Sequence, residues 1–217
     1  MQFDPDGAQL FTAAFAPEQI SALENAFAPV PADRPGRRLA QIPGLAALIR
    51  PATAIASAIL GPAARPVRAM LFDKSPARNW ALGWHQDRTI ALAGRIDTPG
   101  YGDWTVKQGI AHAVPPFEIL ARMLTLRIHL DPAGPANAPL LVAPGSHRLG
   151  RIAERDIASA VAQAGTASCP AERGGLWLYA TPILHASARA QAPARRRVLQ
   201  ILYSADALPG GLEWLGV

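Results

Sequence analysis

The sequence predicts a mainly β protein: an antiparallel sandwich or barrel with helices on its N-terminal side. Half of the 217 residues are hydrophobic and only 17% are charged, so the chain can bury a sizeable core. Helical periodicity occurs in the N-terminal part of the chain. From about residue 66, short and partly alternating apolar runs follow one another without long helices between them. Several such runs in series are typical of an antiparallel sandwich or barrel.

The N-terminal part contains three predicted helices. The first spans residues 17–28, where Pro17 suits a first helical position and apolar residues recur at spacings of three and four. Two shorter helices are expected at residues 44–49 and 51–60, because Pro51 interrupts the apolar pattern between them.

Five later segments are typical of strands, separated by Pro, Gly and Asn. They are VRAMLF, MLTLRIHL, PLLVA, GLWLYA and RVLQILYS. Residues 88–118 combine Gly, Pro, Asp and aromatic residues with little periodicity, so we expect a long loop there, of the kind that covers a site. We expect one domain over residues 1–217, with a helical flank at 1–64 and the β core at 65–217.

Composition indicates the class of ligand and the cellular compartment, and it excludes some kinds of site. The net charge is +5 and the pI is near 10.1, which weakly favours an acidic ligand. The alternative is that the high Arg content reflects codon usage and has no functional cause. The single cysteine, Cys169, excludes an intramolecular disulfide and a Cys-rich zinc site, and we expect a lone thiol without function. We expect no signal peptide and no membrane span, and therefore a cytoplasmic protein.

The segment NWALGWHQD places His85 and Asp87 two residues apart. On a strand these two side chains share a face, while Gln86 points to the other side. One imidazole and one carboxylate are two legs of the facial triad of non-haem Fe(II) oxygenases. The alternative is a buried His–Asp hydrogen bond without a metal. Trp84 is expected to face away from the site and pack in the core.

A third ligand must come from a distant histidine, and the candidates are His112, His129, His147 and His185. We prefer His185 because it ends the strand-like run GLWLYATPILH and because Arg196 follows on the next run. A small dicarboxylate could then chelate the metal through its keto-acid end. Its far carboxylate would receive two hydrogen bonds from the guanidinium of Arg196.

The remaining candidates have plainer interpretations. His129 alternates with apolar neighbours, so we expect a structural or pocket-lining residue rather than a fourth ligand. His112 and His147 are expected in loops or turns. If Arg196 points inward, Arg195 and Arg197 point to solvent. The alternative is that all three arginines form a solvated run or a nucleic-acid patch.

Taken together, these motifs resemble the phytanoyl-CoA dioxygenase family of Fe(II)- and 2-oxoglutarate-dependent oxygenases. The stretches that carry the resemblance are LFDKSPARNWALGWHQD, DWTVKQGIAHAVPP, LTLRIHLDPAGPANAPLLVAPGSHRLG and the HAS…RRRVLQILYS ending. They lie within residues 66–204. The resemblance implies a double-stranded β-helix (a jelly roll, cupin-like) with iron near one open end.

The resemblance also implies roles for particular residues. His85, Asp87 and His185 are the implied ligands of Fe(II). Arg196 is implied to hold the remote carboxylate of 2-oxoglutarate, assisted by Ser187.

Three further positions match the family less directly. Trp104 matches a family tryptophan near the cosubstrate, and Met70 matches a position that lines the same pocket. Lys74 is expected either to neutralise an acidic cosubstrate or substrate, or to lie on the surface.

The implied reaction is hydroxylation of an unactivated C–H bond of a small molecule, with consumption of O2 and release of succinate and carbon dioxide. The intact carboxylate of Asp87 favours hydroxylation, because related halogenases have a small residue at this position. The first alternative is a cupin-like metalloprotein, an isomerase or hydrolase, that does not use 2-oxoglutarate. The second is a non-catalytic nucleic-acid-binding module, which no helix-turn-helix pattern supports.

Substrate identity and oligomeric state stay open in the sequence. We expect a small-molecule substrate, with the basic pI weakly favouring an acidic one, and no nucleic-acid or membrane partner. Specificity is expected to come from residues 88–118 and from the N-terminal helices.

Overall fold

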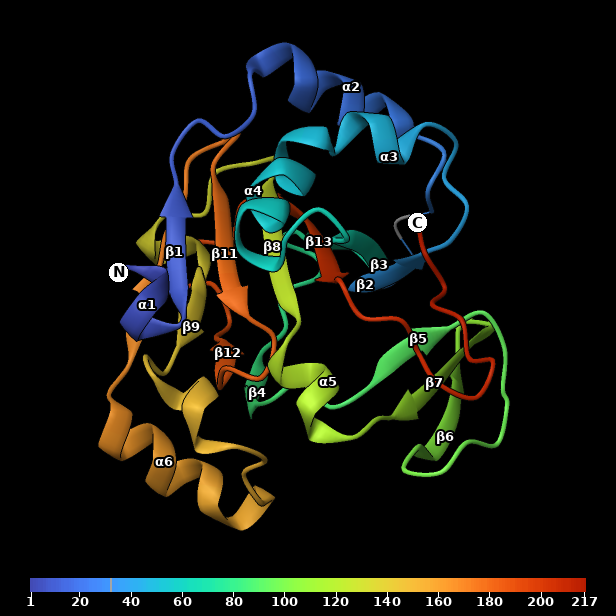
Figure 1. The fold of residues 1–217 in the computed structure, drawn as a ribbon. Coiled ribbons are helices and arrows are strands. Elements are labelled where there is room, and N and C mark those ends of the chain that lie inside the picture. The colour runs from blue at the N-terminus through green and yellow to red at the C-terminus, as the bar shows by residue number, and fades with distance from the viewer. Residues whose placement is uncertain (32) are drawn as a thin grey trace.

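The computed structural model of the chain describes residues 1–31 and 33–217, and its largest element is a six-stranded antiparallel sheet (Figure 1). The strands of this sheet are β1 (Ala8–Phe11), β2 (Gly36–Leu39), β3 (Arg65–Lys74), β8 (Leu124–His129), β11 (Leu176–Ala180) and β13 (Arg196–Ser204). They pair in the order β1-β11-β8-β13-β3-β2.

A second antiparallel sheet lies opposite the first. Its strands are β4 (Leu82–His85), β9 (Leu140–Val142), β10 (Ala167–Cys169) and β12 (His185–Ser187), in the order β10-β9-β12-β4. Along the chain, β3, β8, β11 and β13 of the large sheet are interleaved with these four strands. This connectivity is a double-stranded β-helix, so the predicted mainly β jelly roll is confirmed. All five predicted strands are present, as β3, β8, β9, β11 and β13.

The predicted N-terminal helices are also present. They are α2 (Pro17–Phe27), α3 (Leu45–Leu48) and α4 (Arg50–Leu60), and Pro51 lies in the first turn of α4, where its missing N–H leaves no hydrogen bond unmade. The other helices are α1 (Phe3–Asp6), α5 (Phe117–Ala121), α6 (Ile157–Ala164), and the 3-10 turns η1 (Pro135–Asn137), η2 (Ser146–Leu149) and η3 (Glu154–Asp156). Within the described residues, no helix has the length and apolar character needed to cross a bilayer.

Helices α2, α3 and α4 cover one face of the large sheet (Figure 1). Ile20 and Ile49 from the helices and Leu126 and Ile201 from the strands are fully buried in this interface. Because side chains alternate along a strand, the intervening residues of β3, β8 and β13 face the second sheet. Both faces of β8 are therefore covered, and all six of its residues are buried.

The expectation of a purely helical flank at residues 1–64 is wrong. β1 pairs with β11, and β2 pairs with β3, so this part of the chain also supplies the two outer strands of the large sheet. Each is only four residues long. In strands this short, conformation depends on the partner strand more than on the segment's own pattern.

The expectation of a long loop at residues 88–118 is also wrong. The segment contains β5 (Ile90–Leu92), β6 (Gly102–Lys107) and β7 (Ile110–Val114), paired in the order β5-β7-β6, followed by α5. The β6–β7 register shifts between Gly102 and Thr105, which breaks the alternation that would have indicated a strand.

Arg197 was expected in solvent, and this too is wrong. Its side chain faces the outer side of the sheet, but α2 covers that side, and the guanidinium donates hydrogen bonds to Asp131 at 2.8 Å and pairs with Glu24. Glu24 also accepts from Arg173, with Nη2–Oε2 at 2.7 Å. Arg195 is exposed as expected and pairs with Asp73. The Glu24 cluster thus joins α2 to the sheet.

We predict an acid-dependent loss of stability at Glu24. Hydrogen bonding from Arg173, with the charge of Arg197, lowers the pKa of Glu24 from 4.5 to about 2 despite burial. A carboxylate with a depressed folded-state pKa stabilises the fold above its unfolded pKa, and this contribution is lost as the pH falls from about 4.5 to about 2. Glu24→Gln should lower the free energy of unfolding by about 1–3 kcal/mol at pH 7 and by much less at pH 2.5.

Urea unfolding at a series of pH values measures this difference. Glu18→Gln is the matched control, because Glu18 is exposed on the same helix. An equal effect of Glu24→Gln at pH 7 and pH 2.5 would contradict the prediction.

Candidate active site

A cavity of about 210 Å³ lies between the inner faces of the two larger sheets. Met70, Arg127 and Gln200 line it from the large sheet, and His85 and His185 line it from the four-stranded sheet. Each side chain reaches the cavity because its strand alternates between the interior and the other face.

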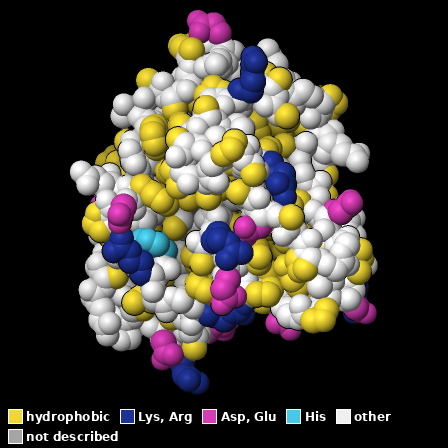
Figure 2. All heavy atoms as spheres, viewed as in Figure 1, with side chains coloured by type: hydrophobic (Ala, Val, Ile, Leu, Met, Phe, Trp, Pro, Cys, Tyr) yellow, Lys and Arg dark blue, Asp and Glu magenta, His cyan; other side chains and the backbone are white. Residues whose placement is uncertain are grey.

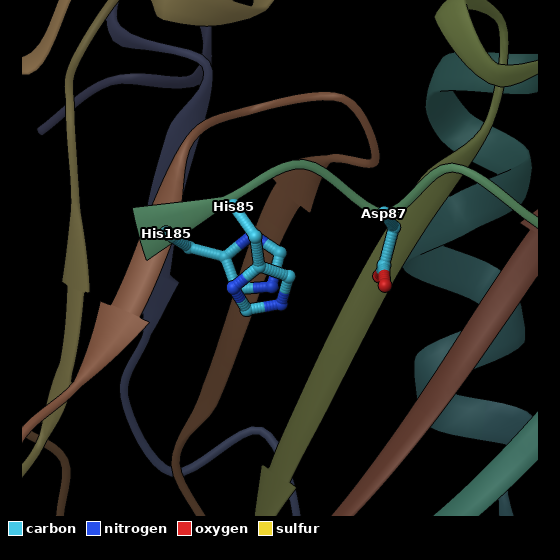
Figure 3. A group of neighbouring side chains, drawn as sticks. All are labelled: His85, Asp87 and His185. Carbon is cyan, nitrogen blue, oxygen red and sulfur yellow. The ribbon is translucent and has the colours of Figure 1, made fainter. Parts of the chain in front are cut away.

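The structure brings His85, Asp87 and His185 together (Figure 3). His185 in β12 lies directly opposite His85 in β4, which places the ring centroids 4.2 Å apart. β4 ends at His85, and Asp87 follows in the next segment with its carboxylate turned toward the same space. One ligand atom from each residue lies within 4.8 Å of the others. Among the residues described, this is the one group of three or more His, Cys, Asp or Glu with that convergence.

The backbone determines which nitrogen of each imidazole is free. His85 Nδ1 lies 2.8 Å from the carbonyl of Gly83, and His185 Nδ1 lies 2.9 Å from the carbonyl of Ile183. A carbonyl only accepts, so each Nδ1 carries the proton and donates it. Each Nε2 is left with a lone pair that can bind a metal, and the backbone bond fixes the orientation of the ring.

The protonation states of the triad suit a cation. Burial and the neighbouring His85 lower the pKa of His185 to about 4, so its imidazole is neutral at pH 7. Burial would raise the pKa of Asp87, but the positive field of Arg68 and the neighbouring cations outweighs it and holds that pKa below its usual range. The Oδ2 atom of Asp87 is buried without a hydrogen-bond partner. Two imidazoles with free Nε2 atoms and an unpartnered carboxylate fit a divalent metal.

Gln86, between His85 and Asp87, points to the opposite side of the chain and fixes the H-x-D segment by hydrogen bonds. Its amide donates to the carbonyls of Gly150 (3.0 Å) and Pro182 (2.8 Å) and accepts from the N–H of Ile152 (2.9 Å). Trp84 packs against the apolar cluster beneath α6, as expected for a core residue. The residues around the H-x-D motif therefore anchor it to the loops before α6 and before β12.

A second group of predicted residues gathers at one end of the cavity. Arg196 lies opposite Lys74 in the β13–β3 register, and both side chains are only 3% exposed. The ammonium of Lys74 donates to Ser187 Oγ at 2.9 Å and to the carbonyl of Trp80 at 2.7 Å. Burial and the charge of Arg196 lower the pKa of Lys74 to about 8. Lys74 is therefore a cavity residue and not a surface lysine.

Met70 lines the cavity, but Trp104 does not. Trp104 lies in β6 and packs against the apolar cluster of the three-stranded sheet, with Arg95 5.5 Å from its ring. Predicting Trp104 near the cosubstrate was wrong as to position, because its side chain packs on the apolar cluster of the three-stranded sheet, whereas Lys107 at the end of the same strand reaches the cavity.

The other histidines differ from one another. His129 is 1% exposed, neither ring nitrogen has a hydrogen-bond partner, and burial lowers its pKa to about 3, which fits a structural residue. His112 was expected in a loop but is fully buried in β7, where its Nε2 accepts from Arg38 at 3.3 Å. His147 lies in the turn η2, as expected.

The sequence interpretation missed four cations that line the cavity, namely Arg38, Arg68, Lys107 and Arg127. A signal for two of them was present: Arg68 shares its strand face with Met70, which the family resemblance had assigned to the pocket, and Arg127 alternates with apolar residues in a predicted strand. No such signal existed for Arg38 and Lys107, which lie in segments not recognised as strands.

Comparison with known proteins identifies the family. The family model of phytanoyl-CoA dioxygenase (PhyH) matches residues 41–198, most of the chain. The chain therefore belongs to the phytanoyl-CoA dioxygenase family, as the sequence motifs indicated, and it is a 2-oxoglutarate-dependent oxygenase. A search of the curated proteins gave no match.

Several solved structures share the fold at low sequence identity. AviO1 from Streptomyces viridochromogenes Tue57 is 22% identical, with a TM-score of 0.67 over 96% of this chain and 94% of AviO1. EctD from S. alaskensis, crystallised with 2-oxoglutarate and 5-hydroxyectoine, is 21% identical, with a TM-score of 0.70 over 99% of this chain and 77% of EctD. HygX from Streptomyces hygroscopicus, crystallised with nickel, 2-oxoglutarate and hygromycin B, is 14% identical, with a TM-score of 0.63 over 93% of this chain and 84% of HygX.

We predict that Gln86 positions the H-x-D segment. Gln86→Met keeps the volume but removes three hydrogen bonds to buried backbone groups, so the free energy of unfolding should fall by about 1–3 kcal/mol. Affinity for Co(II), followed by its visible absorption, should fall about 10-fold or more, because partners of this kind orient metal ligands.

The exposed Gln163→Met in α6 should change neither property. Unaltered Co(II) affinity in Gln86→Met would show that the segment is held by other contacts.

Proposed function

We propose that this protein hydroxylates an unactivated C–H bond of a small-molecule substrate, using O2 and 2-oxoglutarate and releasing succinate and carbon dioxide. One oxygen atom of O2 enters the new hydroxyl group and the other enters succinate, so the atoms balance. The observation that supports this most strongly is the placement of the His85, Asp87 and His185 group in the same cavity as the buried Arg196.

In this proposal, His85, Asp87 and His185 hold iron(II). The iron supplies the oxidising chemistry once O2 and 2-oxoglutarate have bound. The chain's own contribution is orientation: the Nδ1–H bonds to Gly83 and Ile183 keep both imidazoles aimed at one point, and Asp87 supplies the single negative charge. Three protein ligands on one side leave the opposite side for the cosubstrate and O2.

The residues at the far end of the cavity suit a carboxylate. The Nε of Arg196 is buried without a partner, so this guanidinium has a free donor. Lys74 adds a second cation beside Ser187. We assign Arg196, Ser187 and Lys74 to the remote carboxylate of 2-oxoglutarate, with Met70 forming an apolar part of the wall.

A substrate would reach the triad from another direction. A hollow of about 600 Å³ beside α6 is lined by Trp84, Arg88 and Lys107, and it shares His85 and Asp87 with the inner cavity. EctD and HygX were crystallised with 5-hydroxyectoine and hygromycin B, respectively. These compounds support a small-molecule substrate for this chain as well.

We predict an anaerobic spectroscopic signature. Fe(II) followed by 2-oxoglutarate should produce a weak visible charge-transfer band that requires both additions. His185→Ala should abolish the band. Arg196→Ala should weaken 2-oxoglutarate binding at least about 30-fold, because truncating one partner of a buried charge pair costs about 2–5 kcal/mol.

Arg195→Ala is the matched control, since this neighbouring side chain is 59% exposed and pairs with Asp73. It should leave the 2-oxoglutarate affinity unchanged. Folded protein that binds Fe(II) but develops no band would overturn the proposal and favour a cupin-like enzyme that does not use 2-oxoglutarate.

A pH dependence should follow from Lys74. With its pKa lowered to about 8, this ammonium loses its proton as the pH rises through 8, and its attraction for a dicarboxylate is lost with it. The dissociation constant of 2-oxoglutarate should therefore increase between pH 7 and pH 9. In Lys74→Met, binding should be weaker at pH 7 and nearly independent of pH over this range. The same alkaline increase in Lys74→Met would assign the titration to another group.

A further inference from the structure

The cavity contains far more positive than negative charge. Its described lining includes six Lys or Arg side chains and one carboxylate, that of Asp87. Iron(II) and the 2-oxoglutarate dianion would add equal and opposite charges, so the excess of positive charge would persist in the loaded site. Like charges that share a buried space repel one another, so a further anion would be favourable there.

Arg127 lies midway along the cavity, beside Gln200, and the other cations lie toward its two ends. Lys74 and Arg196 face each other at one end of the β3–β13 pair. Arg68 lies six residues earlier on the same face of β3, about 20 Å along the strand at about 3.3 Å per residue. A carboxylate held by Arg196 therefore lies beside Lys74, at the opposite end of this strand from the backbone of Arg68.

Arg68 makes no salt bridge among the described residues, and the carboxylate whose pKa it lowers, that of Asp87, also faces His85 and His185. It is 6% exposed, its Nε is buried without a partner, and its one hydrogen bond is to Met70 Sδ at 3.1 Å. A thioether sulfur is a weak acceptor, and a guanidinium stays charged at all relevant pH values. Arg197, by contrast, is paired with Asp131 and Glu24. An unpaired buried charge is costly, and an incoming anion would remove this cost.

Arg38 and Lys107 stand beside this end of the cavity. Arg38 in β2 lies opposite Met70, and its Nε donates to His112 Nε2 at 3.3 Å. Burial lowers the pKa of His112 to about 4, so this imidazole is a neutral acceptor that orients the guanidinium without cancelling its charge. Lys107 in β6 lines both the cavity and the outer hollow.

Another contact joins the two segments that carry these cations. Gln108 accepts from the N–H of Arg38 at 2.9 Å and donates to the carbonyl of Gly36 at 3.0 Å. β2 is thereby attached to the β6–β7 turn, and Arg38 and Lys107 are held near each other. On the face seen in Figure 2, Lys and Arg side chains are interspersed with Asp and Glu, whereas the lining of the cavity has six cations and one carboxylate.

We propose that Arg38, Arg68 and Lys107 form a second anion site, which binds a carboxylate or phosphate group of the substrate. The inference rests on the proposed function and gives it a substrate class: small molecules with an anionic group, held so that a C–H bond lies at the triad. The anion enters through the outer hollow, where Lys107 meets it first, and is bound by Arg68 and Arg38 in the interior.

The test uses the protein loaded anaerobically with Fe(II) and 2-oxoglutarate. Acetate and methylphosphonate serve as carboxylate and phosphate probes, with acetamide as an uncharged analogue of acetate, and binding is measured by calorimetry. At least one anion should bind while acetamide does not, and the tighter of the two identifies the class. Arg68→Gln and Arg38→Gln should each weaken this binding at least 10-fold, whereas the exposed Arg95→Gln should not.

The charge-transfer band separates the two proposals. If wild-type protein shows no band, the proposed function itself fails. If the band is present but no probe binds, or if Arg68→Gln and Arg38→Gln bind the probes like wild type, only the second anion site fails. Displacement of 2-oxoglutarate by the probes would also overturn it, because the cluster would then be part of the cosubstrate site.

Thermal unfolding of the metal-free protein provides a further readout. Arg68→Gln should melt at the same or a higher temperature than wild type, because it removes an uncompensated buried charge. A lower melting temperature, together with unchanged anion binding, would assign Arg68 a structural role instead.

Discussion

The register in which β13 pairs with β3 on one side and with β8 on the other determines which side chains line the cavity. In this register Arg196 lies beside Lys74, and Gln200 lies between Met70 and Arg127. Most of the alternate residues of the same strands are apolar and pack beneath α2, α3 and α4, and the charged Arg197 among them is paired there with Glu24 and Asp131. A shift by one residue would exchange these two sets, placing charged groups under the helices and leucines in the cavity. Burial of apolar side chains beneath the helices and placement of charged side chains in the cavity therefore favour the same register.

The two walls of the cavity differ in chemistry. The four-stranded sheet presents two imidazoles and, from the segment after β4, one carboxylate, which together suit a divalent cation. The large sheet presents guanidinium and ammonium groups, which suit carboxylates. A metal ion chelated by an anionic cosubstrate needs both walls: ligands for the metal on one and cations for the carboxylates on the other. The antiparallel opposition of His85 and His185 places both imidazoles at one point of their wall, and the large sheet forms the other side of the same cavity.

Buried positive charge on this scale opposes folding of the empty protein. Arg68, Arg127 and Arg196 each keep an Nε without a hydrogen-bond partner, and each is buried. The apolar cluster beneath α2–α4 and the paired charges of Glu24, on the outer side of the sheet, supply compensating stability away from the site. Anions that bind the native state would add to this stability in proportion to their affinity and concentration.

Local periodicity was sufficient to predict the five central strands, the three N-terminal helices and the mainly β class. The H-x-D motif and its spacing to His185 and Arg196 indicated the family. Only the tertiary structure decided that residues 36–39 and 102–114 contain strands, that Trp104 lies outside the cavity, and that Arg38 and Lys107 reach it. β2 takes its conformation from β3, which lies far from it in the sequence and leaves no local signal, whereas the shifted register of β6 with β7 breaks the alternation by which strands are recognised.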